Sequence, residues 1–188
     1  LVSFGERMSV RIVSSNLNRL GVPSLAFDSW KIGLKTTSQF GNADVDPESY
    51  ERIRNHFKKL DTMVVPVITG FLAHDQNGRI TTLGRGGSDY SAALFGEAVH
   101  AKDIQIWTDV SGVATTDPRI CPAAKPIREI SFEEAAELAT FGAKVLHPTT
   151  LWPAMRKDIP VFVGNSMAPS DPGTWIKSSA DVQPLLRA

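Results

Sequence analysis

Short apolar runs alternate with helical patterns along this chain, and this alternation constrains its fold more than any other feature. Apolar residues at helical spacing predict helices, and continuous apolar runs bounded by turn residues predict strands. We expect helices over 6–20, from 46 to about 57, over 88–100 and 131–141, and after 148, with strands over 24–27, 63–69 (buried), 104–107 and 161–164. Strands that alternate with such helices are typical of a mostly parallel sheet with helices on both faces. The sequence therefore predicts an α/β fold, a three-layer α/β/α sandwich around a mostly parallel central sheet.

Cap and turn residues mark several of these boundaries. Gly21 lies where a helix C-cap belongs, and Asp46-Pro47-Glu48 combines a capping residue, a first-turn proline and an acid. Asn77-Gly78 is a strong hairpin signal. Ser131 and Glu134 have the spacing of a capping box, which predicts a helix start there.

The composition excludes several classes of protein. Twenty basic residues balance twenty acidic ones among 188, so we expect no nucleic-acid partner. No apolar run approaches the roughly 20 residues of a membrane span, and the apolar, strand-like first residues lack the cationic flank of a signal peptide. The single Cys121 excludes an internal disulfide and favours a reducing compartment, where we expect an inert thiol. At this length we expect one domain over 1–188.

A glycine-rich turn, Gly84–Gly87, runs directly into a predicted helix and contains three glycines and one arginine. Its glycines permit positive φ and let backbone N–H groups approach a ligand closely. Ser88 or Asp89 is expected to cap the helix, whose N-terminus offers unpaired donors and the positive end of its dipole. Arg85 suits recognition of a carboxylate or a phosphate. We expect an anion site here; the alternative is a tight loop that only caps the helix.

Four segments are expected to end strands or begin helices, where ligands bind in parallel α/β sheets. They are Phe4-Gly5-Glu6, Ile68–Phe71, the glycine-rich turn and Trp107–Val113, and we expect them to line one crevice. The chain contains no GxxxxGK[ST] motif, and the glycine-rich turn lacks the third glycine of a dinucleotide fingerprint. A nucleotide site in this chain would therefore use neither of these two motifs.

Other polar residues each have a purely structural alternative. Thr108-Asp109 can be a strand end with an Asx turn, and Asp117-Pro118-Arg119 can be only a turn. Lys144 can be a solvated lysine, and His147-Pro148 a structural helix start. The remaining histidines show no spacing that suggests metal ligation, so we expect no metal site built from side chains.

Several segments closely resemble aspartate kinases, and the resemblance runs nearly from end to end. These segments are Leu83–Asp89, Trp107–Val110, Thr115–Arg119 and Ser131–Pro148. The Thr-Asp-Val-x-Gly-Val pattern at 108–113 and Asp117-Pro118-Arg119 are shared across the wider amino acid kinase family, including glutamate 5-kinases and uridylate kinases. Gly84–Asp89 and Phe141–Pro148 are the segments that select aspartate kinase within that family.

The resemblance implies the amino acid kinase fold and the ATP-dependent phosphorylation of the side-chain carboxylate of L-aspartate to 4-phospho-L-aspartate. This is the first step toward lysine, threonine and methionine. A carboxylate with an ordinary pKa near 4 is ionised at neutral pH, so the acceptor needs no general base. ATP is the implied second substrate, and phosphoryl transfer implies Mg²⁺ bound largely through phosphates. The resemblance also implies a homodimer of the full-length enzyme, located in the cytoplasm, or in the plastid of a photosynthetic eukaryote.

The resemblance further implies roles for individual residues. Arg85 would grip the α-carboxylate of aspartate, while Glu6 and Asp89 would hold its ammonium group. Ser88 and Phe71 match other positions of the substrate pocket, and Arg85 and Asp89 are the implied catalytic pair. The implied nucleotide site consists of Thr108 and Asp109 at the ribose and adenine side, together with Arg119, Lys144 and Val145.

Two features depart from the family pattern. Ala114 stands where related enzymes often carry tyrosine, so an aromatic contact near the nucleotide is absent or replaced. The family's N-terminal strand and glycine loop, with its phosphate-binding lysine, has no counterpart before Leu1, and the two ACT regulatory domains do not follow Ile176. We therefore expect an internal piece of the catalytic domain, incomplete at the N-terminus, that does not turn over alone. The alternatives are another amino acid kinase, or a noncatalytic nucleotide-binding or assembly module.

Overall fold

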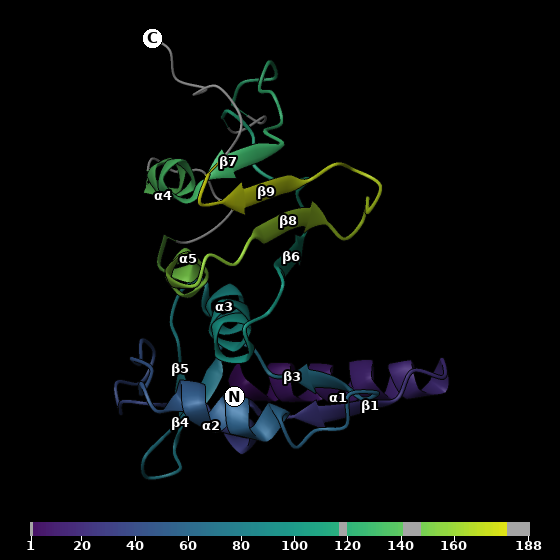
Figure 1. Ribbon diagram of the computed structural model, residues 1–188, viewed down its shortest axis with the longest axis vertical. Coiled ribbons are helices and arrows are strands. Elements are labelled where there is room, and N and C mark those ends of the chain that lie inside the picture. The colour runs from purple at the N-terminus through teal and green to yellow at the C-terminus, as the bar shows by residue number, and fades with distance from the viewer. Residues whose placement is uncertain (1, 117–119, 141–147, 180–188) are drawn as a thin grey trace. The chain divides into compact units, whose positions relative to one another are not determined.

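A computed structural model describes residues 2–116, 120–140 and 148–179 of the chain (Figure 1). The chain divides into two compact units, residues 1–99 and 100–188. The single domain expected over 1–188 stays a prediction, because two compact units can belong to one domain.

The described residues of the first unit form three α-helices, one 3₁₀ helix and five short strands. In chain order these are α1 (Val2–Arg19), β1 (Ser24–Phe27), the 3₁₀ helix η1 (Ser29–Ile32), β2 (Lys35–Thr36), α2 (Ser49–Phe57), β3 (Val65–Ile68), β4 (Leu72–Asp75), β5 (Ile80–Thr82) and α3 (Gly87–Val99). Strand β1 pairs with β3 in parallel, from Ser24 opposite Val65 to Phe27 opposite Ile68. Strand β4 pairs in parallel with β2 and antiparallel with β5. The β4–β5 hairpin confirms the signal at Asn77-Gly78, where Gly78 has φ 76°.

Three expectations for this unit are wrong. The strand-like N-terminal stretch is helical, so Phe4-Gly5-Glu6 lies within α1 and not at the end of a strand. Its apolar residues follow helical spacing into Met8 and Ile12, and this pattern outweighs the β-propensity of the first residues.

The strand expected over 63–69 forms as β3, but it is not buried as expected. Met63 and Val65 are 74% and 43% exposed. Ser88 and Asp89 lie in the first turn of α3 rather than before it, since the helix begins at Gly87.

The core of the first unit lies beneath the glycine-rich turn. Leu83, which directly precedes the turn, is buried with Leu94 and Ala98 of α3. Ile53 of α2 and Ala73 of β4 belong to the same apolar cluster. Packing at Leu83 and Leu94 therefore fixes the turn from both ends.

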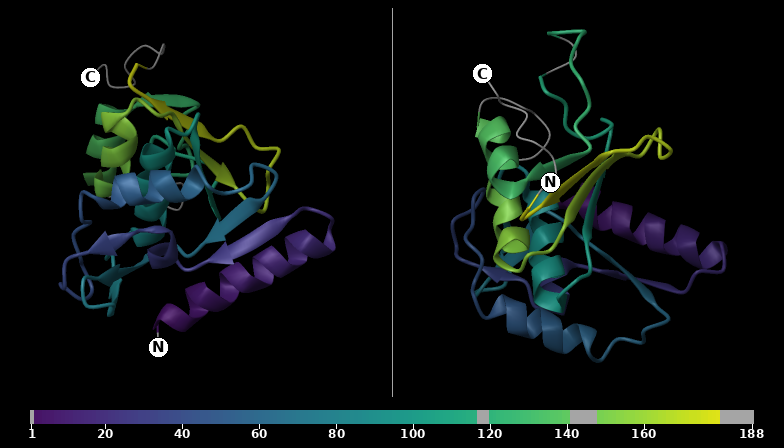
Figure 2. Two further views of the ribbon diagram at one scale, coloured as in Figure 1. Left: turned by 60° about the horizontal axis from the view of Figure 1, so that its bottom comes forward. Right: turned by 45° about the horizontal axis from the view of Figure 1, so that its top comes forward.

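The described residues of the second unit form a four-stranded sheet and two helices. Its elements are β6 (Ile104–Thr108), β7 (Glu129–Ser131), α4 (Phe132–Thr140), α5 (Pro148–Arg156), β8 (Val161–Asn165) and β9 (Thr174–Lys177). The strand order is β6-β8-β9-β7, in which only the β8–β9 pair is antiparallel. Helices α4 and α5 lie along one face of this sheet (Figure 2). Four of the six strand pairs in the described parts of the chain are parallel, as an α/β fold requires.

The capping box at the start of α4 is confirmed. The backbone N–H of Ser131 donates to Glu134 Oε2 at 3.0 Å, and the N–H of Glu134 donates to Ser131 Oγ at 3.1 Å. The expected end of this helix near Phe141 lies outside the described residues. Among the residues described, no helix is both long enough and apolar enough to cross a membrane.

Candidate functional site

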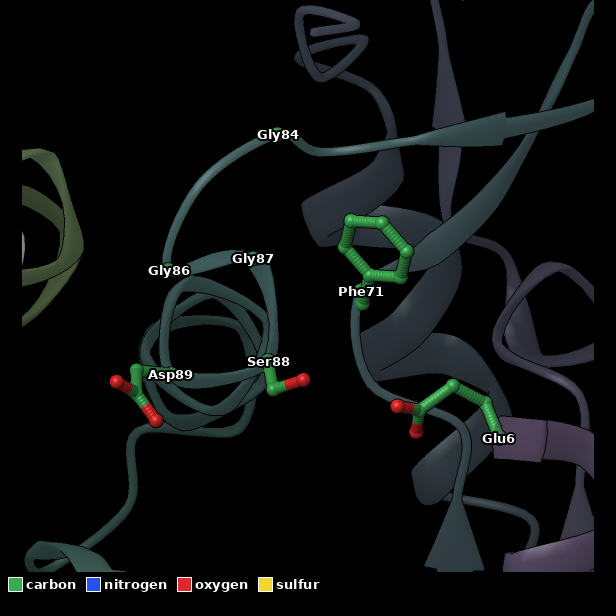
Figure 3. A pocket seen from close by; sticks show the side chains of 7 residues that line it. All are labelled: Glu6, Phe71, Gly84, Gly86, Gly87, Ser88 and Asp89. Atoms are coloured by element: carbon green, nitrogen blue, oxygen red, sulfur yellow. The ribbon is translucent and has the colours of Figure 1, made fainter. Parts of the chain in front are cut away.

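One pocket of the first unit gathers three of the four segments expected to line a crevice. It has a volume of about 320 Å³ and lies between α1, the loop after β3 and the start of α3 (Figure 3). Its lining residues are Glu6, Phe71, Gly84, Gly86, Gly87, Ser88 and Asp89. The fourth segment, Trp107–Val113, belongs to the second unit.

The glycine-rich turn has the backbone geometry that its composition predicts. Gly84 and Gly86 have φ 78° and 70°, a region that residues with a Cβ rarely adopt. The N–H of Gly87 donates to the carbonyl of Gly84 at 3.1 Å and closes the turn. Asn42 lies so close to Gly84 that a Cβ there would meet its Oδ1 at 2.5 Å. The turn is thus both bent and tightly packed, which only glycine allows.

Phe71 is held in the pocket by an unusual backbone conformation. Its φ is 64°, a strained value for an aromatic residue. The N–H of Phe71 donates to Ser91 Oγ at 2.8 Å, and its carbonyl accepts the N–H of Leu83 at 2.9 Å. Ser91 in turn donates to the carbonyl of Gly87 at 2.7 Å. Buried Ser91 therefore ties Phe71 to the start of α3. The sequence did not predict this role, and its only sign there is a polar residue on a buried face of the helix.

The two carboxylates of the pocket point in different directions. In Figure 3 the side chains of Glu6 and Ser88 are directed toward each other, while the carboxylate of Asp89 points away from Phe71. Burial raises the pKa of the Asp89 carboxyl above its ordinary value. The pocket is thus lined by two acidic residues whose carboxylates face in different directions.

Arg85 is exposed and is not one of the residues that line the pocket. It makes no hydrogen bond or ion pair within the described parts of the chain. Since its neighbours Gly84 and Gly86 both line the pocket, Arg85 stands at the edge of the pocket with a free guanidinium group. Its role in gripping a carboxylate stays a prediction.

The nucleotide residues implied by resemblance are described only in part. Thr108 ends β6, and its hydroxyl donates to Oδ1 of exposed Asp109 at 3.1 Å. Ala114 forms an isolated bridge with Pro126. Arg119, Lys144 and Val145, as well as His147, lie outside the described residues.

Buried Thr174 fixes the segment that follows Thr108, a contact that sequence reasoning missed. The N–H of Val113 donates to Thr174 Oγ1 at 2.8 Å, and that hydroxyl donates to the carbonyl of Ile127 at 2.5 Å. Ser111 donates to Asp171 Oδ2 at 2.5 Å and accepts from Asn165 at 3.1 Å. No signal in the sequence marks these bonds, because their partners are up to 61 positions apart.

Two of the histidines in the described parts of the chain pack against aromatic rings. His74 stacks on Trp30 with ring centroids 4.3 Å apart, and His56 meets Phe27 edge to face at 5.4 Å. No group of three or more potential metal ligands occurs among the described residues. Cys121 is a free, exposed thiol.

Comparisons with known proteins agree with the resemblance. Lysine-sensitive aspartokinase 3 of Escherichia coli is 48% identical over all of this chain, which spans 42% of that protein. Chloroplastic aspartokinase 1 of Arabidopsis thaliana is 45% identical over 97% of the chain, which spans 32% of it. The solved structure of E. coli aspartokinase III in complex with aspartate and ADP superposes with a TM-score of 0.89 at 46% identity, and the match covers 100% of this chain and 42% of that one.

These matches confirm the predicted fold class. The chain spans less than half the length of each of these relatives. The model of the amino acid kinase family matches residues 1–165. With most of its length matched in this way, the chain belongs to the amino acid kinase family.

Proposed function

We propose that the enzyme containing this chain is an aspartate kinase, which transfers the γ-phosphoryl group of ATP to the side-chain carboxylate of L-aspartate. The product is 4-phospho-L-aspartate, at the start of the route to lysine, threonine and methionine. The observation that carries the proposal is the pocket, which is lined by Glu6 and Asp89 and by Gly84 and Gly86, the two neighbours of Arg85; Arg85 has no ion pair within the described parts of the chain. The similarity to a protein solved with aspartate and ADP supports it.

The charges of the pocket suit an α-amino acid. An ammonium group is stabilised by Glu6 or Asp89, and an α-carboxylate by the guanidinium of Arg85 and the N-terminus of α3. Ser88 can donate a further hydrogen bond, and the ring of Phe71 covers one side. These contacts leave the second carboxylate of aspartate as the reacting group.

The reaction then needs positioning more than proton transfer. An ionised carboxylate oxygen forms a bond to the γ-phosphorus as the bond to the bridging oxygen breaks, and ADP leaves with that electron pair. This account explains why the described pocket includes no histidine. Thr108 and Asp109, together with Arg119, Lys144 and Val145, are proposed to hold the nucleotide.

Mg²⁺ is proposed to enter with ATP. The described residues contain no cluster of three potential ligands, which fits an ion held mainly by phosphates and water. When bound, the ion would neutralise charge on the transferring phosphoryl group.

The proposal is tested with the complete protein that contains residues 1–188. ATP-dependent acyl phosphate is trapped with hydroxylamine while L-aspartate, L-glutamate and UMP are offered as acceptors. We expect hydroxamate with L-aspartate alone. ADP release with UMP would instead identify another amino acid kinase, and nucleotide binding without turnover on any acceptor would identify a noncatalytic module. We also propose that the full-length enzyme is a homodimer, as the resemblance implies, and native mass spectrometry of the same protein tests this.

The role of Arg85 is tested by Arg85→Ala. We expect the KM for aspartate to rise about a hundredfold, the order of a lost charge-assisted contact, while the KM for ATP changes little. Arg19→Ala is the matched control, because Arg19 is an exposed arginine outside the pocket, and within the described residues its side chain donates a hydrogen bond to Asn16 alone. An equal rise in both KM values would overturn the role.

A further inference from the structure

Polar side chains of helix α1 bond to both ends of the first strand. Four of them recur at the spacing i, i+4, i+7 and i+11, which places them on one face of the helix. Together with their partners at both ends of β1 they form what we call the polar seam: Arg7, Arg11, Ser14, Asn18, Ser24 and Asp28.

One end of the polar seam is a buried carboxylate with two arginines. Asp28 follows β1 and is 6% exposed. Arg11 donates to both of its oxygens at 3.1 Å, in a bidentate arrangement. Arg7 donates from Nε to Asp28 Oδ1 at 3.3 Å, and its guanidinium lies over the ring of Trp30 at 5.8 Å. Such forked contacts are directional and fix orientation as well as distance.

At the other end of the polar seam, the side chain of Asn18 makes the pair of backbone hydrogen bonds that a neighbouring strand would otherwise make. The N–H of Ser24 donates to Asn18 Oδ1 and the carbonyl of Ser24 accepts from Asn18 Nδ2, each at 2.9 Å. The hydroxyl of Ser24 donates to Ser14 Oγ at 3.1 Å. Both ends of β1 are therefore bonded to the same face of α1.

Apolar packing constrains the rotation of this helix only weakly, because one valine is buried and Leu17 is half-buried. Within α1, all of which is described, Val10 and Ser14 are the only buried residues. Met8 and Ile12 are 60% and 63% exposed. A shift of one residue turns a helix by about 100° and would break every bond of the polar seam, whereas burial of one valine tolerates small rotations. Polar contacts of this kind are best known for setting register.

Glu6 directly precedes the first residue of the polar seam and points into the pocket (Figure 3). We propose that the polar seam fixes the rotation of α1 and thereby holds the Glu6 carboxylate in the pocket, with Asp28 as the positioning residue that acts through Arg7 and Arg11. The identity of the ammonium-bearing ligand rests on the proposed function, but the positioning of Glu6 does not.

A double-mutant cycle in the complete protein tests the proposal. Asp28→Asn keeps the shape of the side chain and removes its charge. We expect the KM for aspartate to rise about tenfold, while the KM for ATP stays within about twofold. In a Glu6→Gln background the same change is expected to have almost no further effect on the KM for aspartate, because Asp28 acts through Glu6. Equal rises in both backgrounds, or equal rises for both substrates, would overturn the proposal.

A conservative variant, a matched control and a hydrogen-exchange measurement separate the proposal from a general loss of folding and from the identity of the acceptor. Arg11→Lys keeps a positive charge beside Asp28 but loses the fork, and we expect a smaller rise of the same kind. Asp44→Asn is the matched control, since Asp44 is an exposed aspartate outside the polar seam. Hydrogen exchange needs no turnover: Asp28→Asn must speed exchange in α1 while α2 is unchanged, and unchanged α1 exchange contradicts the proposal. An unmodified protein without aspartate turnover would count against the proposed function alone.

Discussion

The ring of Phe71 lies against Gly87 so closely that a Cβ at this glycine would be 2.7 Å from the ring carbon Cδ2. The same Cβ would be 3.3 Å from the Cβ of Leu83. The first residue of α3 and the loop after β3 are thus packed against each other with no room for a side chain. The position of Phe71 in the pocket depends on this contact.

Gly87→Ala is expected to displace the ring of Phe71 and to weaken acceptor binding. Overpacking of this kind costs about 1–3 kcal/mol, and we expect a similar fall in the free energy of unfolding. The KM for aspartate should rise and the KM for ATP should not. Gly5→Ala is the control: a Cβ at Gly5 meets nothing within 4 Å, so alanine should stabilise α1 by roughly 0.5–1 kcal/mol. If Gly87→Ala leaves the free energy of unfolding unchanged, the ring of Phe71 can shift away from this position without cost, which contradicts the prediction.

Acceptor affinity is expected to depend on pH through Asp89. Burial raises the pKa of this carboxyl, so the proton is lost at a higher pH than in the unfolded chain. Because an ammonium group binds the ionised form, affinity should rise as pH increases through the raised pKa. Calorimetric titration with L-aspartate across this range measures the effect, and Asp89→Asn should remove it. A pH dependence that persists in the variant would assign the effect to another group.

The same raised pKa predicts a stability effect of the opposite sign. Above the raised pKa the folded protein holds a partly buried charge, and this cost shrinks as pH falls from the raised pKa toward the unfolded value. We therefore expect Asp89→Asn to have a higher free energy of unfolding than the unmodified protein at neutral pH, as measured by urea denaturation. The difference should shrink as pH falls toward the ordinary value of 3.8.

Asp75 is expected to contribute stability that acid removes. Burial opposes its ionisation, but hydrogen bonds from the backbone and side chain of Arg79, and from Ser38 and Asn77, outweigh burial and lower the pKa of the carboxyl from 3.8 to about 2. A lowered pKa stabilises the fold above the unfolded value, and this contribution is lost as pH falls from 3.8 to about 2.

Urea denaturation at a series of pH values should show this loss for the unmodified chain and not for Asp75→Asn. The variant should also be less stable at neutral pH, because it loses the ion pair with Arg79 at 2.7 Å. Parallel pH curves for the two proteins would contradict the assignment.

Gly112→Ala is expected to disrupt the segment after β6. Gly112 has φ 94°, and a Cβ there would collide with Thr174 Oγ1 and lie 2.8 Å from the Thr174 nitrogen. Gly41→Ala separates the two causes, because Gly41 has φ 95° with nothing within 4 Å. The control should lose about 1 kcal/mol from backbone strain alone, and Gly112→Ala should lose clearly more. Equal losses of stability for the two variants, measured by thermal denaturation, would mean that the segment after β6 accommodates the added methyl group at no further energetic cost.

The sequence by itself determined the features that depend on neighbouring residues. The capping box of Ser131 and Glu134, the hairpin at Asn77-Gly78 and the positive φ of Gly84 all follow from signals within a few positions. The alternation of strands and helices determined the α/β class. The family resemblance placed Glu6, Phe71 and Ser88 at one pocket, and the structure brings these residues together.

Only the tertiary structure decided which distant residues hold that pocket in shape. Ser91 fixes Phe71 across 20 positions, and Asp28 binds Arg11 across 17. Propensity and periodicity act through the backbone over a few residues, so they do not report such bonds. The direction of the Asp89 carboxylate and the rotation of α1 depend on packing and on directional hydrogen bonds, which exist only once the segments have come together.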